Sequence, residues 1–504
     1  MKIITLLFFL FVNAIPKANA QPTYNEQYRP QIHFSPKAHW MNDPNGMVYY
    51  KGVYHLFFQY YPGGTVWGPM HWGHATSKDL IHWQQQPIAL YPDSLGYIFS
   101  GSAVVDKNNT TSFDKNGEVP LVAIYTSHDP VSEKAHQNNY QNQCLAYSID
   151  NGKTWKKYEH NPVLKNPGIT DFRDPKVMWY APGKKWIMTL ATKDRVTFYS
   201  SADLKKWEKE SEFGEDAGAH GGVWECPDLF ALKNNKGKKI WVLIVNINPG
   251  GPNDGSATQY FLGNFDGKKF VAYSKATKWL DYGPDEYAGV TWNNTGSRKI
   301  FLGWMSNWLY ANVVPTIKWR NAMTIPRELK LKQIGENIFV VSRPVKELNT
   351  IQERPIVADN ILVTKSFNIA QKAKGIKFPC CLNISMDTLK DFSLILSNDL
   401  GEQLKIGYDH NRHQYYIDRA KSGKIDFQKD FAERHTAPRF TENPKMNISL
   451  VIDVSSVELF ADDGLTVMTE IFFSNKPYDK MVIHSPDKLF IKKIEYVKLK
   501  SIWK

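Results

Sequence analysis

The chain has 504 residues, of which 42% are apolar and 22% charged, and it contains 16 Trp, 25 Tyr and 27 Phe. This composition excludes a disordered protein and a fibrous repeat. The formal net charge is +12, but the basic residues are dispersed among acids, so we expect no nucleic-acid partner. A chain of this length exceeds what one hydrophobic core usually supports, which predicts two domains.

The first twenty residues have the three-part pattern of a secretory signal peptide. Lys2 precedes an apolar run at residues 3–12, and residues 18–20 (Ala-Asn-Ala) have the small-x-small pattern of a cleavage site. The apolar run is too short to span a bilayer. We therefore predict a signal peptide cleaved near Ala20 and a secreted or periplasmic protein without a membrane span. A buried amino-terminal helix is the alternative.

Residues 30–340 are a succession of short β-type runs separated by Gly, Pro, Asn and Asp. A weak repeat recurs at residues 77–83, 148–155 and 201–207, where a Ser and an Asp precede a Trp. Turns repeated at intervals of about one four-stranded sheet predict the blades of a β-propeller. A large β-sandwich with coincidental turns is the alternative.

A change of pattern at residues 342–358 predicts a linker, because two Arg-Pro pairs occur there with little apolar periodicity. Beyond it, runs such as 392–396 and 446–454 alternate apolar and polar residues, which is typical of half-buried antiparallel strands. We therefore predict an all-β chain. Its expected parts are the signal peptide at 1–20, a β-propeller catalytic domain at 25–341, the linker at 342–358 and a β-sandwich at 359–504.

The cysteines are too few to crosslink a chain of this length, and none has the spacing of a zinc ligand set. We expect buried free thiols at Cys144, Cys226, Cys380 and Cys381. His71 and His74 lie close in sequence, but no acidic ligand is near, so structural or sugar-contacting roles are favoured over metal binding. We predict no metal site and no cofactor.

Three carboxylates have surroundings that a solvated surface acid would not need. Asp43 lies in a Pro- and Gly-containing turn just before a strand, and Asp174 follows Arg173, whose guanidinium can hold a carboxylate ionised or bind hydroxyls. Glu225 lies between Trp224 and Cys226. An apolar environment there would favour its protonated form, which suits a proton donor.

Each acid taken alone has a structural interpretation, because Asp-Pro pairs form turns and Arg-Asp pairs are often structural. Taken together, an ionised Asp and a protonated Glu form the pair that acid-assisted glycosidic cleavage requires. The inner strands of a propeller converge on one axial funnel. The three acids can therefore meet although they are far apart in sequence.

At these residues the chain resembles glycoside hydrolase family 32, the β-fructofuranosidases that include invertases, inulinases and levanases. The resemblance covers nearly the whole mature chain in an ordered set of motifs. They lie at residues 40–46, 58–60, 67–68, 99–102, 173–175, 225–226, 281–288 and 455–460. The resemblance implies a five-bladed β-propeller followed by a β-sandwich, and the number of blades rests on the resemblance alone.

By this similarity Asp43 is expected to be the nucleophile, Glu225 the acid/base and Asp174 the stabiliser of the transition state, in a retaining double displacement. The other family-like residues would contact the substrate through hydrogen bonds or apolar walls. They are Trp40, Asn42, Gln59, Trp67, Phe99, Ser100, Arg173, Asp285 and Trp308.

The chain departs from the family pattern at Glu286, at residues 289–290 and at residues 60–62, which bears on substrate preference more than on catalysis. The expected function is hydrolysis of β-fructosidic bonds in levan or inulin, and in sucrose after these, by exo cleavage that releases fructose. Alternatives are an endo-levanase, a fructosyltransferase and, in a different class, a non-catalytic fructan-binding protein. The partner is a fructan or fructo-oligosaccharide, and the sequence leaves the oligomeric state open.

Overall fold

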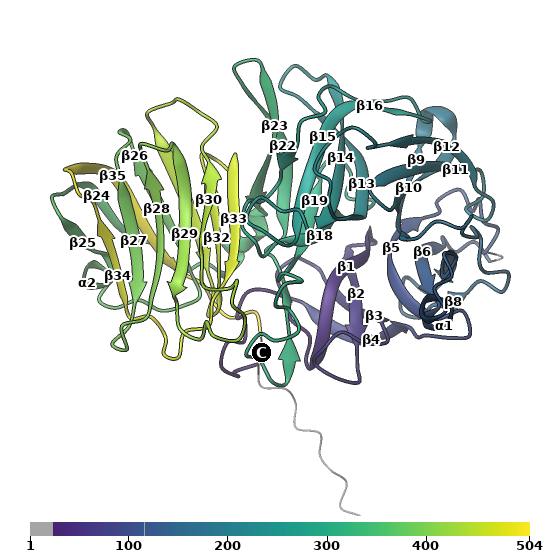
Figure 1. Cartoon of the computed structure of the whole chain (residues 1–504), viewed down its shortest axis with the longest axis horizontal. Coiled ribbons are helices and arrows are strands. Elements are labelled where there is room, and N and C mark those ends of the chain that lie inside the picture. Colours follow the sequence, from purple (N-terminus) through teal and green to yellow (C-terminus); the bar gives the residue numbers. More distant parts are fainter. Residues whose placement is uncertain (1–23, 115, 504) are drawn as a thin grey trace, which may run out of the picture.

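The computed structural model describes residues 24–114 and 116–503, so the predicted signal peptide lies outside the described residues. These residues are almost entirely strands and loops. Figure 1 shows two bodies side by side, one built from β1 to β23 and the other from β24 to β35. In the described ranges no helix is long and apolar enough to cross a membrane.

The first body has five sheets in the described part of the chain, each built mainly from consecutive antiparallel strands. The first sheet consists of β1 (His39–Tyr50), β2 (Val53–Tyr61), β3 (His71–Ser77), β4 (Gln84–Leu90) and, parallel to β1, β20 (Trp319–Arg320). The second consists of β5 (Tyr97–Val105), β6 (Leu121–His128), β7 (Gln141–Ser148) and β8 (Lys156–Lys157). The third consists of β9 (Phe172–Tyr180), β10 (Lys185–Thr192), β11 (Arg195–Ser201) and β12 (Glu208–Phe213).

The remaining two sheets complete this body. The fourth consists of β13 (Val223–Lys233), β14 (Lys239–Asn248), β15 (Ala257–Phe265), β16 (Phe270–Ala272) and β17 (Lys278–Trp279). The fifth consists of β18 (Tyr287–Thr291), β19 (Ile300–Met305), β21 (Ala322–Met323), β22 (Arg327–Ile334) and β23 (Asn337–Pro344). The strands β1, β5, β9, β13 and β18 contact one another in a closed ring. This radial arrangement of sheets is that of a β-propeller.

Each strand of the ring is interrupted near its start by a β-bulge, in which two residues face a single residue of the neighbouring strand. A bulge bends its strand and re-aims the side chains beside it. The bulged pairs are residues 42–43, 99–100, 174–175, 226–227 and 288–289. Because each bulge occupies the same place in its sheet, the five pairs gather at one end of the ring.

The predicted Ser/Asp repeat forms the turn between the third and fourth strands of three sheets. In the first sheet the Ser77 hydroxyl donates to Asp79, whose carboxylate accepts the backbone N–H of Ile81. Equivalent bonds form at residues 148–155 and 201–207. The repeat is therefore a structural motif that satisfies the backbone of each turn.

The second body is a sandwich of two six-stranded sheets. One consists of β24 (Ile356–Val363), β26 (Cys380–Met386), β31 (Met446–Ile452), β32 (Ser456–Ala461), β33 (Thr466–Ile471) and β35 (Leu489–Lys498). The other consists of β25 (Ser366–Asn368), β27 (Phe392–Ser397), β28 (Gln403–Asp409), β29 (Gln414–Lys421), β30 (Arg434–Pro438) and β34 (Lys480–His484). Buried side chains of both sheets, such as Leu382 and Leu394, form one core.

The helices in the described ranges are short. They are α1 (Pro130–Lys134), η1 (Ala181–Gly183), η2 (Lys346–Ile351) and α2 (Ile369–Lys372). The predicted linker at 342–358 is largely regular structure, since it contains the end of β23, all of η2 and the start of β24. Leu348 and Ile351 anchor η2 in the apolar core. Two anchors in a single short helix are too few to produce a visible periodicity in the sequence.

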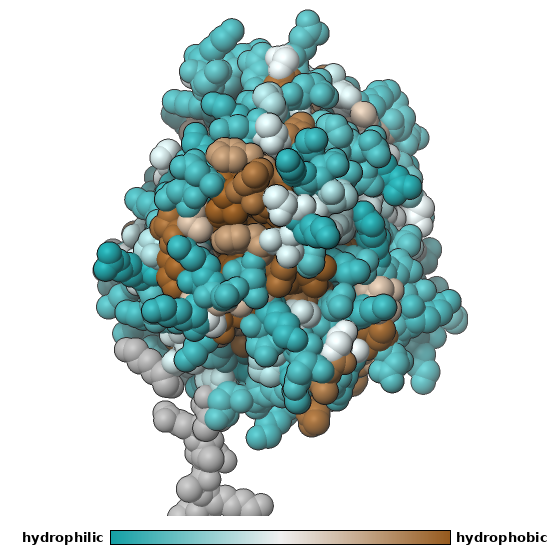
Figure 2. All heavy atoms as spheres, turned by 90° about the vertical axis from the view of Figure 1, so that its left-hand side faces the viewer, coloured by the Kyte–Doolittle hydropathy of each residue, from teal (hydrophilic) through white to brown (hydrophobic). Residues whose placement is uncertain are grey.

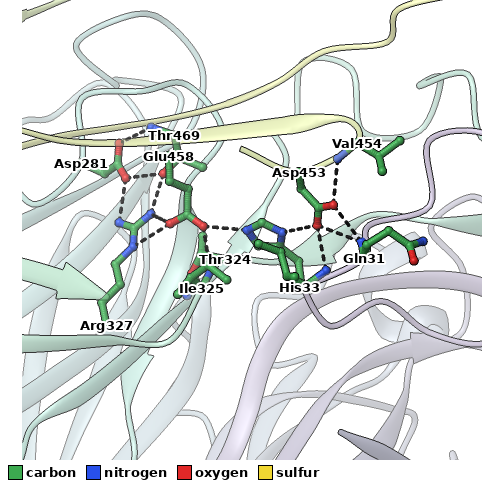
Figure 3. Close-up of polar contacts among 12 residues, drawn as sticks. Gln31, His33, Asp281, Thr324, Ile325, Arg327, Asp453, Val454, Glu458 and Thr469 are labelled. Carbon is green, nitrogen blue, oxygen red and sulfur yellow. Dashed lines mark hydrogen bonds and ion pairs between the residues drawn. The ribbon is translucent and has the colours of Figure 1, made fainter. Parts of the chain in front are cut away.

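The two bodies meet across a buried network of charged side chains (Figure 3). The ring nitrogens of His33 lie 2.7 Å from a carboxylate oxygen of Asp453 and 2.8 Å from one of Glu458. Arg327 of β22 donates to Glu458 and, at 2.8 Å, to Asp281. Burial opposes protonation of His33, but the two carboxylates outweigh it and raise the pKa of His33 to about 9.

The four cysteines are buried and free, as expected. Figure 2 shows the sandwich end of the molecule, where a patch of apolar residues is surrounded by hydrophilic residues. Among the exposed large apolar side chains of the sandwich, Leu362 and Phe490 are cross-strand neighbours on β24 and β35. Within the described ranges no group of three or more His, Cys, Asp and Glu side chains is arranged to hold a metal ion.

Candidate active site

A cavity of about 390 Å³ opens at the end of the ring where the bulges lie, and its lining includes bulge residues of β1, β5 and β9. The cavity brings together all three predicted catalytic acids, Asp43, Asp174 and Glu225. It also brings together seven of the nine predicted substrate contacts. These are Asn42, Gln59, Trp67, Phe99, Ser100, Arg173 and Trp308.

Asp43 lies on the bulge of β1 and accepts hydrogen bonds from Asn42, Ser100 and, at 3.6 Å, the thiol of Cys226. The amide of Asn42 donates to its Oδ1 at 2.9 Å, and the hydroxyl of Ser100 donates to its Oδ2 at 2.6 Å. Burial and then the nearby carboxylate of Glu225 raise the pKa of Asp43, while the hydrogen bonds from Ser100 and Asn42 oppose that rise. Both carboxylate oxygens are therefore fixed in direction before any ligand arrives.

Asp174 lies on the bulge of β9 with a positive φ of 65°, which a non-glycine residue rarely adopts. Its backbone N–H donates to the Thr126 hydroxyl, and its Oδ2 accepts the backbone N–H of Cys226 at 3.0 Å. Burial raises the pKa of Asp174 to about 7 although Arg173 favours the ionised form. The strained backbone is thus secured by hydrogen bonds from two other strands.

Glu225 has polar partners instead of the apolar surroundings that its sequence neighbours predict. Arg173 lies 3.0 Å from its Oε1, and the hydroxyl of Tyr287 donates to its Oε2. The indole of Trp224 points into the core and donates to the backbone oxygen of Ala219. The expected apolar surroundings are therefore replaced by polar partners, because alternate residues of a strand face opposite sides, while only 20% of the Glu225 side chain is exposed.

Arg173 is the only Arg or Lys among the described residues that line the cavity. It also lies 2.5 Å from Asp171, so one guanidinium serves two carboxylates. Because the three predicted catalytic acids share the cavity with a single cation, they cannot all ionise at low cost. The arrangement can therefore hold an ionised carboxylate beside a protonated one, as a displacement with acid assistance requires.

Aromatic rings form part of the cavity wall. Trp67 is 39% exposed and packs edge to face on Phe99, with ring centroids 6.1 Å apart. Its backbone N–H donates to the side chain of Asn312 at 2.8 Å. On this wall the ring of Trp67 therefore remains partly open to solvent.

Trp40 does not touch the cavity, in contrast to the sequence prediction. It is fully buried beneath Trp308, with ring centroids 5.9 Å apart. Its indole N–H donates to Oδ1 of Asn42 at 2.7 Å, which turns the amide nitrogen of Asn42 toward Asp43. Trp40 thus orients the residue that holds Asp43 and lies one layer away from any ligand.

Asp285 also lies outside the cavity, and its predicted sugar contact needs correction. It is fully buried where the two bodies meet, 2.7 Å from Arg419 of β29. It also accepts hydrogen bonds from the Tyr310 hydroxyl at 2.6 Å and from the backbone N–H of Ile471 at 2.9 Å. With both oxygens occupied and no exposed surface, Asp285 stabilises the interface between the bodies.

Several cavity residues were missed by sequence reasoning. Gln141 of β7 accepts the backbone N–H of Phe172 and lies beside Arg173. The sequence carries little signal for this residue, because β7 begins with three polar residues in a row and only the structure shows that Gln141 and Gln143 among them are buried. No pattern marks Glu133 on α1, and Tyr287 is 62 positions from Glu225 in the sequence.

Comparison with known proteins places this geometry among glycosidases. Residues 33–344 match the N-terminal domain of glycosyl hydrolases family 32, and residues 347–500 match the C-terminal domain of the same family. A levanase of Bacillus subtilis is 45% identical, with 99% of this chain and 75% of that protein covered.

Fungal inulinases are also similar. An extracellular exo-inulinase of Aspergillus niger is 41% identical, with 90% of this chain and 91% of the relative covered. The crystal structure of an exo-inulinase from Aspergillus awamori superimposes with a TM-score of 0.88 at 36% identity, over 95% of this chain and 100% of that one. The similarity thus extends over both bodies and includes the cavity.

Proposed function

The chain belongs to glycosyl hydrolase family 32, and from this we propose that it hydrolyses the β-fructosidic bonds of fructans and releases fructose from the chain end. The observation that carries the proposal is the convergence of Asp43, Asp174 and Glu225 in one cavity. Support comes from relatives named levanase and exo-inulinase. In this proposal levan or inulin is a better substrate than sucrose.

The proposed chemistry is a retaining double displacement. Glu225 gives its proton to the glycosidic oxygen while an oxygen of Asp43 attacks the anomeric carbon, so that the leaving sugar departs and a fructosyl ester forms. Glu225, now ionised, takes a proton from water, and the resulting hydroxide breaks the ester. Fructose leaves and Asp43 and Glu225 return to their starting states.

The neighbours of the acids have defined tasks in this scheme. Ser100 and Asn42 fix the oxygens of Asp43, and Arg173 and Tyr287 fix those of Glu225. Asp174 accepts hydrogen bonds from ring hydroxyls, which stabilises the positive charge that develops on the sugar ring in the transition state. Trp67 and Phe99 form the apolar wall against which the furanose packs.

The fold and location are proposed in finer detail on the same grounds. Each of the five sheets of the first body is one blade of a five-bladed propeller, and the second body is the family's β-sandwich. The predicted signal peptide and the inulinase relatives that are named extracellular support secretion. Exo action is favoured because two relatives named exo-inulinase are similar to this chain over 90% and 95% of its length.

The test is analysis of the earliest products when residues 21–504 act separately on levan, inulin and sucrose. Fructose alone at early times is expected, whereas early oligosaccharides would contradict exo action. Glu225→Gln should abolish turnover and retain binding, and Glu159→Gln, whose side chain is 76% exposed, serves as the control. If the parent enzyme releases nothing from any of these substrates, the proposed function is wrong.

A further inference from the structure

One side of the cavity is lined by residues that have no role in the proposed reaction. It is formed by His128 at the end of β6, by Glu133 on α1 and by Tyr140 just before β7. His128 is 2% exposed, whereas the side chain of Glu133 is 52% exposed. A buried imidazole therefore stands beneath a carboxylate that faces solvent at the mouth of the cavity.

The hydrogen bonds determine which nitrogen of His128 carries the proton. Oε1 of Gln141 accepts the backbone N–H of Phe172 at 2.9 Å, so the amide nitrogen of Gln141 faces Nδ1 of His128 at 3.3 Å. Nδ1 must then accept, which leaves the proton on Nε2. Nε2 donates to Oε2 of Glu133 at 3.0 Å. Burial lowers the pKa of His128, in agreement with a neutral ring.

Packing holds the imidazole in this orientation. Its ring stacks on Phe99 with centroids 4.1 Å apart and planes at 7°, and Tyr140 meets it edge-on at 5.4 Å. The helix α1 is fixed at its start by Asp129, whose side chain accepts the backbone N–H of Val131. Glu133 is therefore anchored by the capped helix and by its bond to the packed imidazole.

The position of this side relative to the acid/base indicates which part of a substrate it would meet. Arg173 donates a hydrogen bond to Glu225 and lies 3.5 Å from Oε1 of Gln141. The amide nitrogen of Gln141 in turn contacts His128. Glu225 must reach the glycosidic oxygen, and the leaving sugar lies on the far side of that oxygen from Asp43. The side of the cavity that is reached from Glu225 through Arg173 and Gln141 therefore borders the leaving sugar.

We propose that Glu133, positioned by His128 and accompanied by Tyr140, forms the subsite for the sugar on the leaving side of the cleaved bond. This inference rests on the proposed function. Oε2 of Glu133 is taken by His128, and no described residue donates to Oε1. That oxygen accepts hydroxyl groups of a neutral sugar, and the ring of Tyr140 packs beside them. Glu133 is thus a specificity residue and His128 a positioning residue.

The experiment compares two fructosides that differ only in the leaving group. In a fructo-oligosaccharide the leaving group is a sugar, whereas in methyl β-fructofuranoside it is methanol, which cannot reach Glu133. The measured quantity is the ratio of kcat/KM for the oligosaccharide to kcat/KM for the methyl fructoside. A carboxylate that bonds a hydroxyl contributes on the order of a tenfold preference. Glu133→Ala should lower the ratio about tenfold, mainly through the KM of the oligosaccharide.

Two further variants show whether His128 acts by positioning Glu133 or whether any substitution changes the ratio. His128→Phe keeps the stacking but removes the donor, so it should lower the same ratio, and the double variant should add little to either single change. Glu442→Ala, in the sandwich and 95% exposed, is the control and should keep the parental ratio. Melting temperatures show whether each variant is folded, and Glu133→Ala tests the inference even if His128→Phe does not fold.

The outcomes distinguish this inference from the function on which it rests. If the parent enzyme cleaves both substrates and Glu133→Ala has the parental ratio, the subsite is wrong and the function stands. An equal loss on both substrates would also contradict the subsite, because it would indicate a disturbed catalytic centre. If the parent enzyme cleaves neither fructoside, the proposed function fails and this inference fails with it.

Discussion

The hydroxyl of Tyr287 donates a hydrogen bond to Oε2 of Glu225, and the two residues come from adjacent sheets of the ring. Each is the residue just before the bulge of its strand, Tyr287 in β18 and Glu225 in β13. The bond therefore joins equivalent positions of neighbouring sheets. It sets the direction of the carboxyl group that is the proposed proton donor.

Removing this hydroxyl by Tyr287→Phe should slow the reaction and leave the fold intact. A hydrogen bond to a charged group contributes about 1.5–3 kcal/mol, so we expect kcat to fall about 10- to 100-fold with KM within twofold. Tyr199→Phe, a buried tyrosine of the third sheet, is the matched control and should keep parental kinetics. Parental kcat in Tyr287→Phe would show that Arg173 alone orients Glu225.

Replacing Asp174 by Asn should lower the activity and raise the stability of the fold. The pKa of Asp174 is about 7 in the fold against an ordinary 3.8, so ionising it costs more in the folded than in the unfolded state. Its contribution to stability is complete below pH 3.8 and is lost as the pH rises through 7. Asp174→Asn does not titrate and keeps an oxygen for the Cys226 N–H.

The expected result is a melting temperature above that of the parent at pH 8, with a smaller difference at pH 5, equivalent to about 1–3 kcal/mol. Activity should fall about 10²- to 10³-fold. Thermal unfolding across this pH range measures the first effect and initial rates measure the second. A variant that is less stable than the parent at pH 8 would contradict the prediction.

His33 should make the junction of the two bodies sensitive to alkaline pH. Its pKa is raised to about 9 from an ordinary 6.5 by Asp453 and Glu458, against the effect of burial. The stabilisation is therefore complete below pH 6.5 and is lost as the pH rises through 9. The free energy of unfolding should decline over this interval.

The check is denaturant unfolding between pH 6 and pH 10. His33→Gln should be less stable than the parent at pH 6. Its free energy of unfolding should then fall much less than that of the parent as the pH rises. His160→Gln, at an exposed histidine, should retain the parental decline. An equal decline in His33→Gln would assign the alkaline sensitivity to other groups.

Asp285→Asn distinguishes a structural role from a sugar contact. The change breaks the 2.7 Å buried ion pair and leaves Arg419 with Glu470, 3.8 Å away, as its remaining carboxylate, a loss that costs up to about 3–5 kcal/mol. We expect a strongly lowered free energy of unfolding, while KM and kcat of the folded fraction stay parental. Asp399→Asn, with a 64% exposed side chain, is the control. An increased KM at parental stability would contradict the structural role and support the sugar contact that the sequence predicts for Asp285.

The architecture and the convergence of the three proposed catalytic acids were predictable from the sequence for separate reasons. Alternating runs and repeated turns reveal strands, because the period of two is local to each strand. The turns at residues 77–83 and 201–207 also carry their own capping bonds. Asp43, Asp174 and Glu225 were found through motifs that resemble a known family, and the cavity brings them together.

What could not be predicted depends on contacts between distant segments. The partners of Glu225 come from other strands, so its neighbours in sequence misled the expectation of an apolar environment. Trp40 and Asp285 occupy recognisable motifs, yet one lies beneath the cavity floor and the other at the junction of the bodies. A motif records that a residue matters, but not whether it touches a ligand or supports a residue that does.

The bulges lie in the strands nearest the axis, whereas strands such as β4, β8 and β12 form the outer edges of their sheets. Between each outer edge and the cavity stand the other strands of that sheet. Substitutions at the periphery therefore have no short route to the reacting groups. The outer edges can therefore be altered, for example to change solubility or attach a label, without moving the side chains that line the cavity.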